Sequence, residues 1–413
     1  MPLTARARIQ RRDPLFDKSK SHKCYDFYLE HIFCRRLPLS LRPDSVCDLL
    51  LRTIEETVMK YFSLSLFLSF LCSIAVHPDV RAGKANGHLD IYWVDVEGGA
   101  ATLVVTPAGE SILIDSGNPG ARDAPRIHEV ATRMAGLTQI DYLITTHFHL
   151  DHFGGAAELA QLMPIKVVYD RGIPEQSPDR NRNDARYPLL IKPYREMEVG
   201  ERRIIEPGLQ LPLKQTFGTA GVSLTCVGVG QSFVDKPLAS GAPVCDASIP
   251  RKLEDLSDNA NSVVVVLEFG AFRFFDAGDL TWNVEDRLVC PENKVGTVDV
   301  YQVTHHGLDQ SNHPAVIRSL QPTVSIMNNG VTKGCGPATF AALKSTPSIQ
   351  AMYQVHKNLK NDSENNTQDA HIANLERDCE GHPIHLSVES NGGAYVVALP
   401  GSGHQRRFET REK

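Results

Sequence analysis

Eleven consecutive residues constrain the fold of this chain more than any other stretch. Residues 145–155 read TTHFHLDHFGG. Four side chains that can ionise or bind a metal fall within six positions of it: His147, His149, Asp151 and His152. The apolar and β-branched run at 142–146 predicts a strand before them, and the glycine pair predicts a sharp turn after them. Because buried ionisable groups each need a partner, the fold must bring this strand end to a shared polar site.

From residue 88 the chain alternates strand and helix signals in two similar halves. In the first half, β-rich runs at 88–96, 101–107 and 111–115 precede a helix at 125–135 and the strand before the motif. The second half repeats this order between residues 262 and 355. Helices on only one side of each half predict two sheets packed face to face with helices outside. We expect an α/β fold, a four-layer α/β/β/α sandwich.

This domain is expected to span residues 83–400. Residues 170–260 are rich in Pro, Arg and Gly and only weakly periodic, which indicates an insertion or lid over the site. Residues 384–399 predict a terminal hairpin, and residues 401–413 a polar tail.

The first eighty residues have a different pattern. At 59–82 a lysine, an apolar run and small residues before Ala82 are typical of a secretory signal peptide cleaved after Ala82. A membrane anchor or a buried helix is the alternative. Residues 1–58 would then precede a start at Met59, as a non-native extension or a disordered cytoplasmic tail. The signal predicts export to the periplasm or the medium, with no stable membrane span after cleavage.

Charge does not favour nucleic acid as a partner. The chain has 43 Lys and Arg against 49 Asp and Glu, a formal net charge of -6. Residues 1–58 contribute +3 (11 against 8) and residues 59–82 contribute +1 (2 against 1), which leaves -10 for the exported portion. Since charge-driven binding of a polyanion needs a basic surface, a small molecule is the favoured partner.

Cysteine use fits export only loosely. Five cysteines follow Ala82: Cys226, Cys245, Cys290, Cys335 and Cys379. They have no CxxC spacing, so the sequence does not support a zinc ribbon. An oxidising compartment would allow one or two disulfides and leave one free thiol, with the pairing open.

The side chains of the 145–155 stretch are those that zinc prefers. Neutral imidazoles and a carboxylate are zinc ligands, and alternate positions in a strand-end loop let His147 and His149 address one ion. Asp151 and His152 would address its neighbour. We therefore expect one or two Zn²⁺ ions as cofactor, with Mn²⁺ as the alternative.

This stretch resembles the metal-binding signature of the metallo-β-lactamase superfamily, whose other motifs follow in order over residues 88–356. The resemblance implies that Asp115 in ILIDSG orients the ligand loop from behind the ligands. It also implies that Asp279 in FFDAGDL bridges two ions and that the pair His305 and His306 in VTHHG supplies a late ligand. The motifs VDVEGGAATLVVTPAGESILIDSG, NANSVVVVLEF and THHGLDQSN are most similar to the hydrolase domain of bacterial DNA-uptake competence proteins and its secreted relatives.

The sequence departs from the family pattern at one ligand. Many members have a further histidine between the first motif and the bridging aspartate, whereas residues 153–278 contain none. Asn259 or Asn261 is the preferred replacement, as an oxygen ligand or a donor behind the ligands. Cys226 and Cys245 are less suitable.

Three late positions complete the predicted site. Strand alternation puts His305 on the face of Tyr301 and Val303, so we expect His305 as the ligand and His306 facing the substrate; the reverse is the alternative. Lys333, among glycines after a strand, is a candidate for binding an anionic group or else a solvated lysine. His356, at the end of a predicted strand, is a candidate for contacting substrate or moving a proton.

Together these features predict a metal-dependent hydrolase that uses a metal-bound hydroxide. Asp151 or Asp279 would orient the water and take its proton, and a metal-bound water or the substrate-facing histidine would protonate the leaving group. A phosphodiester or related small substrate is favoured because two-metal sites suit phosphoryl transfer. Hydrolysis of a lactone, amide or thioester is the alternative, and a non-catalytic metal-binding protein is the third hypothesis.

Overall fold

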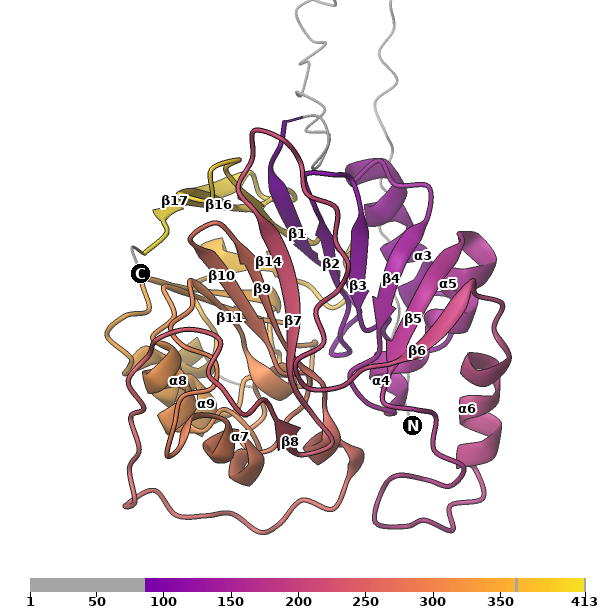
Figure 1. Ribbon diagram of the computed structural model, residues 1–413, viewed down its shortest axis with the longest axis horizontal. Coiled ribbons are helices and arrows are strands. Elements are labelled where there is room, and N and C mark those ends of the chain that lie inside the picture. Colours follow the sequence, from indigo (N-terminus) through magenta and orange to yellow (C-terminus); the bar gives the residue numbers. More distant parts are fainter. Residues whose placement is uncertain (1–85, 361–362, 412–413) are drawn as a thin grey trace, which may run out of the picture. The chain divides into compact units, whose positions relative to one another are not determined.

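Two large β-sheets lie at the centre of the structure (Figure 1). This computed structural model describes residues 86–360 and 363–411, so the predicted extension and signal peptide at 1–82 lie outside the described residues. Within the described part, no helix is both long enough and apolar enough to cross a membrane.

The first sheet combines residues from both ends of the described chain. It is antiparallel from its C-terminal edge strand to β3 and parallel from β3 to β6. Its strands are, in sheet order, β17 (His404–Glu409), β16 (Ala394–Leu399), β15 (Ile384–Val388), β1 (Leu89–Trp93), β2 (Thr102–Val105), β3 (Ser111–Ile114), β4 (Ile140–Ile144), β5 (Ile165–Asp170) and β6 (Glu201–Ile204).

The second sheet is built from the middle of the chain. It is parallel from β14 to β10 and antiparallel from β10 to β8. Its strands are, in sheet order, β14 (Ile372–Asn374), β13 (Ala351–His356), β12 (Val324–Met327), β11 (Val300–Gln302), β10 (Phe272–Asp276), β9 (Val264–Phe269), β7 (Val222–Val229) and β8 (Ser232–Phe233).

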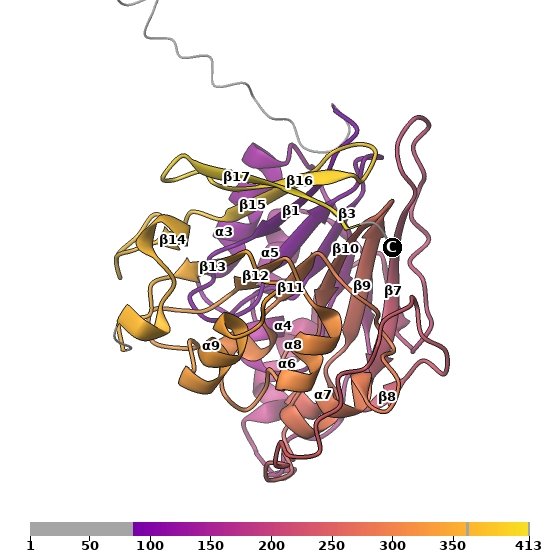
Figure 2. The same cartoon turned by 90° about the vertical axis from the view of Figure 1, so that its left-hand side faces the viewer.

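Helices cover the outer face of each sheet, as Figures 1 and 2 show. The first sheet carries α3 (Asp123–Glu129), which continues as a π-helical turn to Met134, together with α5 (Ala156–Leu162) and α6 (Tyr187–Glu196). The second sheet carries α7 (Trp282–Val289), α8 (Pro314–Leu320) and α9 (Pro337–Lys344). The predicted α/β/β/α sandwich is confirmed.

Alternation along the strands builds three apolar layers. In β10, Phe274 points between the sheets and packs edge-on against Trp93 from β1, with ring centroids 5.6 Å apart. The next residue, Phe275, points outward to the layer shared with α7 and α8. Each buried aromatic side chain stabilises the fold by roughly 1.5–3 kcal/mol, so the two sheets hold rigid strand ends for the loops between them.

Two expected segments differ from the structure. The expected insertion or lid at 170–260 is wrong for its middle part. There α6 packs in the helical layer outside the first sheet, β6 is a strand of that sheet, and the eight-residue β7 is a strand of the second sheet. The expected polar tail at 401–413 contains β17, which pairs along its whole length with β16. β6 and β17 have mostly polar, exposed side chains, and the neighbouring strands of the sheet supply the backbone pairing that makes them strands. β7 is apolar and buried, and no such reason accounts for its being missed.

One disulfide joins two segments of the second sheet's outer side. Cys245 is bonded to Cys290, at the end of α7, and so fixes the long connection after β8. Three described cysteines lie outside this bond: Cys226, Cys335 and Cys379. The described part of the chain therefore has one disulfide, within the expected one or two.

Candidate metal centre

The predicted ligands sit in loops at the ends of strands from both sheets. β4 leads into the motif, whose second half forms the short helix α4 (Leu150–Phe153). β10 leads into the loop with Asp279, and β11 leads into the turn Thr304–Gly307 that carries the histidine pair. Parallel pairing of β10 with β11 brings these last two loops to the same sheet edge.

Ligand atoms from three loops converge on the carboxylate of Asp279. Its Oδ2 atom lies 3.2 Å from His152 Nε2, 3.3 Å from His306 Nε2, 3.4 Å from His305 Nε2 and 3.9 Å from His147 Nε2. One ligand atom from each of four residues lies within 4.8 Å of the others: Asp151, His152, Asp279 and His306. This set offers a divalent ion two imidazoles and two carboxylates.

Ring nitrogens of His147 and His149 face each other, Nε2 to Nδ1, at 3.1 Å. Nε2 of His149 bonds to Asp179 Oδ1 at 2.9 Å, and Thr146 Oγ1, which donates to Asp115, accepts from Nδ1 of His147. Burial lowers the pKa of His149, but the hydrogen bond to Asp179 outweighs it and raises that pKa, so a proton on His149 Nδ1 can bridge the two rings. A metal ion bound by both rings would take the place of that proton.

A second pair of facing rings is formed by His152 and His306. Nδ1 of His152 donates to Asp115 Oδ2 at 2.7 Å, and Nδ1 of His306 donates to the carbonyl oxygen of Asn328 at 3.2 Å. Their Nε2 atoms face each other at 3.3 Å. The expected role of Asp115 behind the ligands matches this geometry, because its carboxylate fixes the His152 ring and accepts hydrogen bonds from Thr146.

The electrostatics of the cluster favour added positive charge. Burial lowers the pKa of His152, but the carboxylates of Asp279, Asp115 and Asp151 outweigh it and raise that pKa well above its usual value. Burial raises the pKa of Asp279, yet His152, His305 and His306 hold it well below the usual range. A buried group of ionised carboxylates and imidazoles with this balance fits divalent cations.

Asn259, one of the two expected replacements for the absent histidine, lies beside His305. Its Nδ2 is 3.3 Å from Nε2 of His305, and its Oδ1 is buried without a hydrogen-bond partner in the described structure. An orphaned buried oxygen beside His305 and Asp279 suits a ligand to the first ion. Asn261 instead donates to Asp258 Oδ1 at 3.1 Å and lies away from the cluster.

The structure reverses the expected arrangement of the histidine pair. His306 is the member that joins Asp151, His152 and Asp279, whereas His305 lies beside Asn259 and bonds through Nδ1 to Ser311 Oγ at 3.1 Å. Strand alternation failed here because β11 ends at Gln302, and both histidines have left-handed backbone angles with φ of 55°. The backbone turns twice, so the period of two no longer applies.

Of the two remaining candidates, Lys333 contacts the ligand cluster and His356 does not. Lys333 forms an ion pair with Asp151 Oδ2 and is only about one-third exposed, so it belongs to the cluster. His356 does not contact the cluster among the described residues; its ring is buried against Asp95 and Cys379. His356 therefore lies outside the predicted site, so the expectation that it contacts substrate or moves a proton there is wrong.

Two functional neighbours were not predicted. Asp179 accepts from His149 and also from the backbone N–H of Asp258. Asp258 is buried, accepts from the backbone N–H of Phe148 at 2.7 Å and pairs with Arg171. Both lie in aperiodic stretches outside the motif in sequence. The one sequence signal near them is the polar run Asp258–Asn261, which includes Asp258 itself and Asn259.

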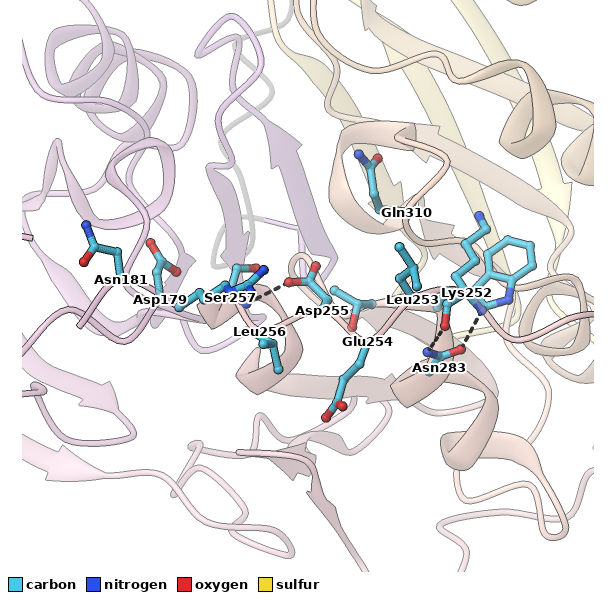
Figure 3. A pocket seen from close by; sticks show the side chains of 13 residues that line it. Asp179, Asn181, Lys252, Leu253, Glu254, Asp255, Leu256, Ser257, Asn283 and Gln310 are labelled. Carbon is cyan, nitrogen blue, oxygen red and sulfur yellow. Dashed lines mark hydrogen bonds between the residues drawn. The ribbon is translucent and has the colours of Figure 1, made fainter. Parts of the chain in front are cut away.

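Figure 3 shows a cavity of about 450 Å³ whose lining includes Asp179 and Thr281. None of the candidate metal ligands lines it, but Asp179 bonds to His149, and Thr281 follows Asp279 by two positions. The far wall carries Leu253, Leu256 and the Trp282 ring, with Lys252 Nζ 3.4 Å from the ring centroid. The size and mixed lining suit a small molecule with an apolar part.

A pH prediction follows from Glu285, which lies on α7 behind the histidine turn. Burial raises its pKa from 4.5 to about 8. Between these values the folded chain keeps a proton that the unfolded chain releases, so its contribution to stability is complete below pH 4.5 and declines as pH rises. Compared with wild type, Glu285→Gln should gain roughly 1.4 kcal/mol per pH unit across this window.

Urea unfolding at pH 5, 6.5 and 8 measures this difference. Asp286→Asn, on the same helix and partly exposed, is the matched control and should follow wild type. Equal stability differences between Glu285→Gln and wild type at all three pH values would contradict the prediction.

Comparison with known proteins agrees with this architecture. Residues 94–234 match the family model described as the metallo-beta-lactamase superfamily. UPF0173 metal-dependent hydrolases of Cupriavidus metallidurans and Cupriavidus necator are similar, at 28% identity over 99 residues and 35% over 92 residues. These matches cover 24% and 22% of this chain, and 32% and 28% of the relatives. The chain thus spans about a third of the length of the curated relatives it matches.

Among solved structures, the metallo hydrolase Igni18 from Ignicoccus hospitalis matches 64% of this chain and 94% of its own length, with 12% sequence identity and a TM-score of 0.35. This likeness bears on neither fold nor activity.

Proposed function

Since the chain carries a metallo-β-lactamase superfamily domain over residues 94–234, we propose that it is a metal-dependent hydrolase of small molecules. The observation that supports this most directly is the convergence of four imidazoles and two carboxylates next to an open cavity. The relatives named metal-dependent hydrolases support the same activity.

The ligand sets divide between two ions. His147 Nε2 and His149 Nδ1, with Asp279 and Asn259, suit the first, and Asp151, His152, Asp279 and His306 suit the second. Zn²⁺ is the proposed metal because nitrogen ligands dominate, and Mn²⁺ is the alternative because of the oxygen ligands. When bound, such ions lower the pKa of water toward ~7 and polarise the bond under attack.

The protein's own groups would position the reaction. Asp151 is held ionised, because the charges of His152, His306 and Lys333 outweigh its burial and keep its pKa well below the usual range. It can therefore orient a water molecule and accept its proton. His305, with a pKa lowered by burial to about 4, stays neutral near pH 7 and faces Asn259 and Asp279. A neutral imidazole there is suited to hydrogen-bonding the leaving group.

A phosphodiester remains the favoured substrate. Lys333 supplies a positive charge at Asp151, and an anionic phosphoryl oxygen would compete for it. The apolar cavity wall at Leu253 and Leu256 suits an apolar or aromatic ester group. The similarity to DNA-uptake proteins stays a prediction from the motifs. Carbonyl substrates such as lactones are the second candidate, supported by the same polarising ions and apolar wall.

Export also remains a proposal. The disulfide between Cys245 and Cys290 supports it, since such bonds persist in oxidising compartments. N-terminal sequencing of the exported product should find Gly83 first; a cytosolic product that retains residues 1–58 would contradict the proposal.

Metal removal and a substrate panel test the activity. Purified protein should hydrolyse bis(p-nitrophenyl) phosphate, lose this activity after chelation, and regain it with Zn²⁺ or Mn²⁺. Faster hydrolysis of p-nitrophenyl esters or lactones would favour the carbonyl candidate. Metal-loaded protein inactive on the whole panel would favour a non-catalytic binding protein. Asp151→Asn should reduce turnover by ~10²–10⁴-fold with the fold intact.

A further inference from the structure

A second group of possible metal ligands lies outside the metal centre. Asp95 follows β1 of the first sheet, His356 ends β13 of the second, and Cys379 lies in the connection between β14 and β15. Asp95 Oδ2, His356 Nε2 and Cys379 Sγ all lie within 4.8 Å of one another. Asp95 and His356 are fully buried, and Cys379 is half-buried.

The three atoms form a nearly regular triangle. Sγ of Cys379 is 3.4 Å from Asp95 Oδ2 and 3.4 Å from His356 Nε2, and the nitrogen is 3.7 Å from the oxygen. Tetrahedral zinc with ordinary bond lengths of ~2.0–2.3 Å separates such ligand atoms by about 3.4–3.6 Å. The triangle thus has the size of one face of a zinc tetrahedron.

Hydrogen bonding alone does not satisfy the His356 ring. Its Nε2 is 3.7 Å from the carboxylate, too long for a hydrogen bond, and its one ring contact in the described structure is the sulfur, a weak partner. Its Nδ1 is buried and has no partner among the described residues. A cation bound at Nε2 would replace the weak sulfur contact with a strong one at that nitrogen, while Nδ1 would still have no partner among the described residues.

Arg126 positions two of the three residues. Nη1 donates to the backbone oxygen and to Oδ2 of Asp95, each at 3.1 Å, and Nη2 donates to the backbone oxygen of Cys379 at 3.3 Å. Asp95 Oδ1 is already used by the N–H of Glu97, so Oδ2 is the oxygen that faces the triangle. The arrangement is held in place by contacts that do not involve a metal.

Solvent can reach the triangle from the Cys379 side. A surface hollow of about 550 Å³ is lined by Arg126, Glu380, Gly381 and His382, next to Cys379 in sequence or in contact with its segment. Binding of a cation would exchange the one S–H proton of Cys379 for one sulfur–metal bond.

We propose that Asp95, His356 and Cys379 form a second metal site, which takes one borderline divalent cation of the zinc class and leaves its fourth position to water. The ion would link the ends of β1 and β13 and so tie the two sheets together. It would also steady the loop after β12, because Asn329 Nδ2 donates to the backbone oxygen of His356 at 2.6 Å. The preceding residue, Asn328, accepts from His306 in the first metal centre.

Cobalt absorption tests the site directly. A thiolate bound to Co²⁺ gives an intense near-ultraviolet band that nitrogen and oxygen ligands do not give, and the first centre contains no cysteine. The full chain is used with four cysteines replaced by serine: Cys24, Cys34, Cys47 and Cys72. We expect the band to saturate at one equivalent of Co²⁺ bound to this site and to disappear when Zn²⁺ is added.

Matched variants assign the band. Cys379→Ser should abolish it, whereas Cys335→Ser, which removes a buried sulfur outside the triangle, should retain it. Asp279→Asn should also retain it, so failure of this site and failure of the proposed hydrolase are distinguished. A band that is absent, or that survives in Cys379→Ser, would overturn the proposal.

Thiol protection is the second measurement and needs no variant at the site. In chelator-treated protein, Cys379 should be the described thiol that reacts with iodoacetamide, since Cys226 and Cys335 are buried. One equivalent of Zn²⁺ beyond the need of the first centre should prevent this alkylation. An unchanged rate of Cys379 labelling with zinc present would contradict the second site.

Discussion

Asp279→Asn is expected to lose both ions of the first metal centre and to show no hydrolysis above background. Oδ2 of Asp279 lies 3.2–3.4 Å from nitrogens of His152, His305 and His306. This one carboxylate is therefore close to ligands from both the 145–155 motif and the turn Thr304–Gly307. An amide cannot offset their charge or bridge two cations. The loss should exceed the ~10–100-fold typical for a residue that only supports a ligand, such as Asp115.

Metal content by mass spectrometry and turnover of bis(p-nitrophenyl) phosphate check this result. Asp235→Asn, an exposed aspartate outside the site, is the control for handling and should keep both metal and activity. A thermal melt confirms that the variant is folded. Asp279→Asn protein with its full complement of first-centre metal would contradict the role of this carboxylate.

The parts of the fold that sequence could predict have strong local patterns. The strand before the motif has a continuous apolar run because β4 is buried on both faces, between α5 and the second sheet. The motif itself follows because several metal ligands at strand-end spacing have few other uses. Asp115 and Asp279 were identified from the resemblance to the metallo-β-lactamase superfamily, and each follows a buried strand, β3 and β10 respectively.

The parts that failed depend on contacts between distant segments. β17 has the sequence HQRRFE, in which five of six side chains are partly or fully exposed, and it is a strand because β16 offers a free edge. Asp179 lies in an aperiodic loop and becomes a neighbour of His149 only through folding. Asp95 and Cys379 are 284 positions apart, so no spacing in the sequence could bring them together.

The histidine pair shows that the local backbone conformation determines which side chain faces the metal ligands. A period of two is a property of extended backbone, and the turn Thr304–Gly307 is not extended. Gly307 has φ of 83°, and a Cβ there would lie 2.6 Å from the sulfur of Met327. This glycine lets the turn press against β12, which brings His306 to the carbonyl of Asn328 and its Nε2 to Asp151.

Alanine variants of the pair should therefore differ in metal content. His306→Ala is expected to lose the ion held with Asp151 and His152, and hydrolysis with it, because three ligands remain and the Asn328 carbonyl loses its donor. His305→Ala should keep that ion and lose roughly 10-fold in turnover, the effect of removing one hydrogen bond of about 1.4 kcal/mol to the leaving group. Its pKa of about 4 leaves the ring neutral, so its removal changes little charge.

Titration of each variant with Zn²⁺, followed by calorimetry, counts the ions bound. His385→Ala, in which the lost ring pairs with Asp90 away from both sites, is the control for removal of a part-buried histidine. If His305→Ala loses an ion while His306→Ala binds as many as wild type, the strand-alternation assignment is right and the geometry of the turn misleads. We expect an ion to be lost only in His306→Ala. That result would mean that the left-handed backbone of the pair makes His306 the ligand in place of His305, the residue that strand alternation predicts.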